Sequence, residues 1–96
     1  MITFEDTTGY SQRDKERIPR IWTYEFNDFV LIVHRHIHHG DEWLMTLRYR
    51  RMALIEGKVL ASKQIEDAKL GAIEVARAAI NAIREDMAEL ERALAS

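Results

Sequence analysis

The sequence predicts an α+β domain, in which an antiparallel β-meander of three to four strands packs on one long C-terminal α-helix. Two observations predict the sheet: residues 21–49 contain apolar segments of strand length, and two turn sequences separate these segments. A third observation predicts the helix, because residues 63–95 contain no proline and are rich in strong helix formers. The chain has 96 residues, of which 47% are hydrophobic, so we expect one globular domain.

The chain divides into an arm and a domain. Residues 1–19 are mostly polar and end at the only proline, Pro19, so we expect a flexible N-terminal arm. Residues 20–96 should form the single α+β domain, with strands at about residues 20–61 and the helix at about residues 63–95.

The pair Asn27-Asp28 marks the first hairpin turn. These residues lie between Phe26 and Phe29 and suit a primed two-residue turn. Such a turn sets the register of the two strands and places three pairs on one apolar face. The predicted pairs are Phe26 with Phe29, Tyr24 with Leu31 and Trp22 with Val33.

The run His38-His39-Gly40 marks the second hairpin turn, with the glycine at the left-handed position. This register brings further apolar side chains to the same face, so both hairpins predict one large core face. The predicted pairs are Arg35 with Trp43, Val33 with Met45, Leu31 with Leu47 and Phe29 with Tyr49. A fourth strand should include residues 58–60 after a break near residues 56–57, whereas residues 52–55 could be strand or connection.

Ser62 is a suitable N-cap for the long helix. At ~1.5 Å per residue the helix would be ~48 Å long and must overhang strands of at most ~30 Å. A stripe of small residues would let the helix lie close to the sheet, and a second, larger apolar stripe predicts a homodimer. The alternative is one wide stripe that serves a single core. The small stripe is Ala68, Gly71 or Ala72, Val75, Ala79 and Ala82, and the predicted dimer interface is Ile73, Ile80, Ile83, Met87, Leu90 and Leu94.

The composition excludes several classes of function. The absence of cysteine excludes thiol catalysis, disulfides and thiolate metal sites. We expect a cytoplasmic protein of a bacterium or a phage-infected cell, because no signal peptide and no membrane-spanning segment are apparent. No local pattern of nucleophile, base and orienting acid is present, so we expect no enzyme activity and no cofactor.

All four histidines lie within six residues, at positions 34, 36, 38 and 39. On a strand, His34 and His36 share a face, and the predicted register places Glu42 opposite His36. Imidazole and carboxylate groups are common metal ligands, so these three residues form a candidate metal site. The alternative is a set of solvated histidines at a hairpin tip.

The outer face of the predicted sheet mixes cationic and apolar side chains. Such a face can hold single-stranded nucleic acid, and the candidate contacts are His34, His36, Arg48, Arg50 and Arg51. Two observations weigh against this function: the large aromatic residues fall on the opposite face, and the net charge of −2 creates no strong attraction for phosphates.

Three segments carry a resemblance to a group of known proteins. They are residues 29–36, residues 43–47, and Leu60-Ala61-Ser62-Lys63 at the start of an Ala/Glu-rich helix. Across residues 22–94 the chain resembles small uncharacterised proteins encoded by phages and prophages. The resemblance implies an intracellular accessory protein that acts by binding, and by analogy an inhibitor or modulator of host machinery such as CRISPR systems. We therefore expect a non-enzymatic protein that works through protein–protein contacts, without a role at membranes.

Overall fold

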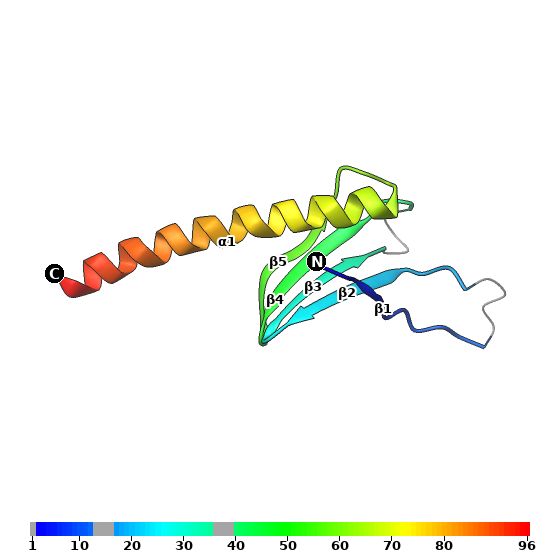
Figure 1. Cartoon of the computed structure of the whole chain (residues 1–96), viewed down its shortest axis with the longest axis horizontal. Coiled ribbons are helices and arrows are strands. Elements are labelled where there is room, and N and C mark those ends of the chain that lie inside the picture. Colours follow the sequence, from blue (N-terminus) through cyan, green and yellow to red (C-terminus); the bar gives the residue numbers. More distant parts are fainter. Residues whose placement is uncertain (1, 13–16, 36–39) are drawn as a thin grey trace.

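The computed structural model describes residues 2–12, 17–35 and 40–96, which form a five-stranded antiparallel sheet with one long helix across one face (Figure 1). The strands lie in the sheet in chain order: β1 (Glu5–Asp6), β2 (Ile21–Phe26), β3 (Phe29–His34), β4 (Leu44–Tyr49) and β5 (Met52–Val59). The helix, α1, spans Ile65–Ala95. The predicted α+β class is confirmed, whereas the predicted count of three to four strands is too low.

The register of the central strands is as predicted. Trp22 pairs with Val33, and Leu31 pairs with both Tyr24 and Leu47. The first turn contains Asn27 with φ 53°, a positive value of the kind that primed hairpin turns require. In the second turn Gly40 has φ 63°, in the left-handed region expected of it, whereas His38 and His39 lie outside the described residues.

The additional strand, β1, lies within the segment predicted to be a flexible arm. Asp6 pairs with Trp22, and the backbone N–H of Thr7 donates to the carbonyl of Ile21 at 2.9 Å. The Thr8 hydroxyl accepts hydrogen bonds from the backbone N–H groups of Arg20 and Ile21. These bonds attach the N-terminal segment to β2, so the sheet extends beyond the predicted start of the domain.

Strand β5 runs through the position where a break was predicted. Gly57 has φ 59°, and the pairing of β4 with β5 shifts register on both sides of Leu47. The Thr46 hydroxyl accepts a hydrogen bond from the N–H of Gly57 at 3.2 Å and so satisfies a donor that the irregular ladder leaves open. The predicted break is therefore an irregularity within a continuous strand.

The β2–β3 and β4–β5 turns lie together at one end of the sheet, which we call the turn end. The N–H of Arg50 donates to the carbonyl of Asp28 at 2.8 Å, and the two side chains form an exposed ion pair at 3.4 Å. Arg50 itself has φ 56°, which is unusual for a residue with a long side chain. The bonds between the turns hold β2, β3, β4 and β5 in one curved layer.

Helix α1 packs on the sheet through alanines. Ala68, Ala72 and Ala76 follow one another at four-residue spacing and are all buried against the sheet. The small stripe was predicted correctly at its start, but it continues at Ala76 and not at the predicted Ala79. The sheet side of this core is Leu31, Val33, Trp43, Met45 and Leu47, with Leu60 from the connection.

The start of α1 differs from the prediction. The N-cap position is Gln64, and the Ser62 hydroxyl accepts a hydrogen bond from the N–H of Gln64 at 3.1 Å. Ser62 therefore closes a turn before the helix instead of capping the helix. Glu66 and Asp67 in the first turn place negative charge at the positive end of the helix dipole.

Candidate binding groove

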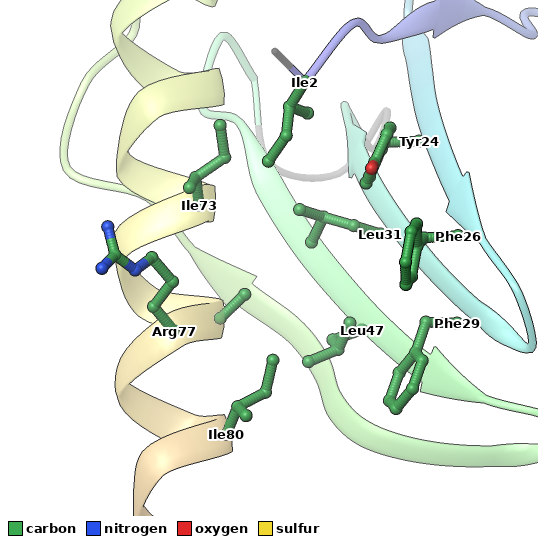
Figure 2. Close-up of a pocket in the computed structure, with 10 residues that line it drawn as sticks. Ile2, Tyr24, Phe26, Phe29, Leu31, Leu47, Ile73, Arg77 and Ile80 are labelled. Carbon is green, nitrogen blue, oxygen red and sulfur yellow. The ribbon is translucent and has the colours of Figure 1, made fainter.

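An apolar cavity of about 390 Å³ opens between α1 and the turn end of the sheet (Figure 2). Ile73 and Ile80 approach it from α1, and strand residues such as Leu31 approach it from the opposite side. The guanidinium of Arg77 is directed away from the strands, so only its aliphatic stem contributes to the wall (Figure 2). The full lining is Ile2, Tyr24, Phe26, Phe29, Leu31, Leu47, Ile73, Ala76, Arg77 and Ile80.

A second cavity, of about 660 Å³, continues the first along the helix. Phe29 and Ile80 line both cavities, so the two form one groove. Phe29 also contacts Tyr49, with ring centroids 4.6 Å apart, and this pair forms part of the floor. The second cavity is lined by Phe29, Tyr49, Met52, Leu54, Ile80, Ile83, Arg84, Met87, Ala88 and Glu91. We call the joined cavities the apolar groove.

The groove exists because α1 and the sheet diverge. The helix has 31 residues and is ~46 Å long, whereas a six-residue strand spans only ~20 Å. Figure 1 shows the C-terminal half of α1 continuing well past the sheet, while the turn end points away from it. Side chains that the alternation places on the core face therefore remain partly uncovered, and Phe26 and Met52 are 59% and 57% exposed.

The predicted dimer residues fall into two groups. Ile73 and Ile80 are half-buried and pack against the core of their own chain. Met87, Leu90 and Leu94 lie on the overhang and are 60%, 57% and 76% exposed, and Ile83 lies at the junction and lines the groove. One apolar stripe thus serves the core in its first half and lies open in its second half.

The four described candidates for nucleic-acid contacts lie on the outer face of the sheet and in the β4–β5 turn. His34 is half-buried on the outer face, with Nε2 3.2 Å from the Thr46 hydroxyl, and Arg48 is exposed there. Arg50 and Arg51 lie in the β4–β5 turn, where Arg50 pairs with Asp28 and its guanidinium lies 5.3 Å from the Tyr49 ring centroid. His36 lies outside the described residues. The aromatic side chains needed for base stacking, including Trp22 and Trp43, belong to the core on the other face.

The predicted metal site involves His34, His36 and Glu42, and His36 lies outside the described residues. Within residues 2–12, 17–35 and 40–96, no three histidine or acidic side chains lie close enough together to hold a metal ion. The described part of the hairpin shows instead Arg35 stacked on Trp43, with the guanidinium carbon 4.4 Å from the ring centroid.

Two further polar clusters lie away from the groove. The ammonium of Lys69 lies 3.8 Å from the Trp22 ring centroid and forms an ion pair with Glu66 at 3.2 Å. The Asp6 carboxylate accepts hydrogen bonds from the N–H of Thr8 and from the hydroxyl of Tyr10. The Lys69 cluster attaches α1 to β2, whereas the Asp6 bonds close a turn within the N-terminal segment.

The Asp6 cluster predicts a pH dependence. Hydrogen bonds from Thr8, with the larger effect, and from Tyr10 hold the pKa of Asp6 below its ordinary value of 3.8. The hydrogen bond between Tyr10 and Asp6 also raises the pKa of Tyr10. A lowered carboxyl pKa stabilises the fold above pH 3.8, and that contribution is lost as pH falls through the folded-state pKa. Replacing Tyr10 with phenylalanine should raise the Asp6 pKa in an NMR titration. An unchanged pKa would contradict the role of this bond.

Most strand side chains of the groove were predicted to lie on the core face, and the prediction missed that they form a surface. Alternation along a strand shows which face is apolar, but it does not show how far the helix covers that face. The signal that was available is the mismatch between helix length and strand length.

In the described part of the chain, no helix has the combination of length and apolar character that a bilayer crossing requires. The chain matches no protein-family model, no curated protein and no solved structure.

Proposed function

We propose that this chain is a non-enzymatic intracellular binding protein that acts through protein–protein contacts, and that the apolar groove is its contact surface. The observation that carries the proposal is the groove itself, with two joined apolar cavities and exposed Phe26, Met52 and Met87 around them. Soluble proteins rarely expose contiguous apolar patches of this kind unless the patch binds something.

The shape and chemistry of the groove suit an amphipathic helix. One wall is α1 and the other is the sheet, so the groove is elongated and is lined by aliphatic and aromatic side chains. A helix can place apolar side chains into such a groove at every third or fourth position. Charged groups near the wall, Arg84 and Glu91, could then select partners with complementary charges.

The resemblance to phage-encoded proteins gives this proposal a biological direction. Small phage proteins of this size often act by binding host proteins, so within the proposal this protein inhibits or redirects host machinery, of which CRISPR systems are one class. Single-stranded nucleic acid is the weaker alternative, because the outer face lacks stacked aromatic groups among its described residues.

Site-specific photo-cross-linking tests the proposed surface. A photoreactive amino acid at Met52 would face the groove, whereas the same group at Ala53, on the next position of β5, would face the opposite side. Both residues are exposed, so both variants should fold. In cells that express these variants, we expect cross-links to protein from position 52 and not from position 53. Cross-links only from position 53, or none from position 52, would contradict the proposal.

A further inference from the structure

We infer that the 660 Å³ cavity of the groove is covered by the C-terminal half of α1 from a second copy of this chain, with the two overhanging helices paired antiparallel. The inference rests on the proposed function, because it names the partner of the same groove.

The first argument is the uncovered seam on the overhang. Ile83, Met87, Leu90 and Leu94 follow one another at steps of four, three and four residues, which is the spacing of a helix–helix seam. Three of the four are more than half exposed, and in the described part of the chain nothing covers them. An apolar seam on a solvated helix end is stable only when another helix packs on it. A second copy supplies a seam of identical spacing.

The second argument is the charge on the flanks of the seam, which selects the antiparallel orientation. One flank of the seam carries Arg77, Arg84 and Glu91 at seven-residue spacing. The other flank carries Ala79, Asp86 and Ala93 at the same spacing. In a parallel pair Asp86 would face Glu91 of the second copy, and like charges would repel. In an antiparallel pair each flank faces the same flank of the second copy. Arg84 of one copy can then face Glu91 of the second copy, and the two-fold symmetry forms this ion pair twice.

This charge pairing also sets the register of the two helices. It places the two-fold axis beside Ala88, so that Met87 meets Leu90 of the second copy and Ile83 meets Leu94 of the second copy. Ile83 lines the 660 Å³ cavity together with Tyr49 and Met52. The end of the second helix therefore enters this cavity from its open side, and each copy covers the cavity of the other.

The first test is the substitution of Met87 by glutamate. Light scattering gives the molar mass of the full chain, with and without the substitution, across micromolar concentrations. Met87 is 60% exposed within one chain, so this substitution should leave the fold of the single chain intact. We expect the unsubstituted protein to be a dimer and the dissociation constant of Met87→Glu to rise by at least about 100-fold, because the charge enters the seam. The matched control is Ala78→Glu, which adds the same charge on the opposite, exposed side of α1 and should leave the dimer unchanged.

A charge exchange tests orientation and register. Arg84→Glu and Glu91→Arg should each weaken the dimer by about tenfold, because two attractive pairs become repulsive, and the double variant should restore it. A monomeric parent protein, a dimer insensitive to Met87→Glu, or a double variant no tighter than the single variants would overturn the inference. The failure of the inference can be distinguished from the failure of the proposed function. A monomer that still cross-links other proteins from position 52 would refute only the pairing with a second copy. The absence of any cross-link from position 52 would refute both.

Discussion

Replacement of Ala72 by glutamate is expected to destabilise the domain strongly. Ala72 is fully buried between α1 and the sheet, with Ala68 and Ala76 one turn away on either side. A carboxylate at this position would lose its hydration and push the helix away from the sheet, so we expect a loss of about 3–5 kcal/mol. Domains of this size are stable by only about 5–15 kcal/mol, so urea denaturation followed by circular dichroism should show a much lower midpoint.

The matched control for this prediction is Ala78→Glu. It makes the same chemical change on the same helix, but Ala78 is exposed, so stability should change by no more than about 0.5 kcal/mol. Equal midpoints for the two variants would mean that α1 does not pack on the sheet through its alanine stripe.

Replacement of Trp43 by alanine is expected to have an effect of similar size. The Trp43 side chain is buried, its indole N–H donates to the carbonyl of Lys63 at 3.0 Å, and the Arg35 guanidinium covers its ring. Truncation leaves a large cavity and an unpaired carbonyl just before α1 begins, so we expect a loss of about 3–5 kcal/mol in urea denaturation.

Trp43→Phe separates the two contributions of this residue. Phenylalanine keeps most of the buried apolar surface but cannot donate to Lys63, so the expected loss is smaller, about 1–2 kcal/mol. If the phenylalanine variant were as unstable as the alanine variant, the hydrogen bond to Lys63 would be the main contribution of Trp43, contrary to this expectation.

The central sheet was predictable because independent signals agreed. The two predicted turns, at Asn27-Asp28 and at residues 38–40, place the same apolar face toward the core, and a slip of one residue would bury Glu25 in place of Tyr24. Strand β1 was not predictable in the same way. Two residues are too short to show alternation, and β1 is held by backbone bonds and by the Thr8 hydroxyl, which leave no periodic pattern in the sequence.

The groove was only partly predictable. The spacing of the helix stripe and the excess length of α1 were both evident in the sequence, and they led to the predicted dimer residues. The sequence does not show where the helix leaves the sheet, because that point depends on the packing of Ala76 and on the curvature of the strands. For this reason Ile73 and Ile80 were assigned to an interface, although they pack against the core of their own chain.

We have proposed that a helix of a second copy packs on the overhang and reaches into the groove. Amide hydrogen exchange at two protein concentrations tests this claim most directly. If a second copy covers the overhang, amides of residues 84–94 should be protected and should gain protection as concentration rises, while the core amides of Val33 and Met45 stay constant. Rapid exchange of the overhang at both concentrations, as expected of a solvated and frayed helix end, would contradict the proposed dimer.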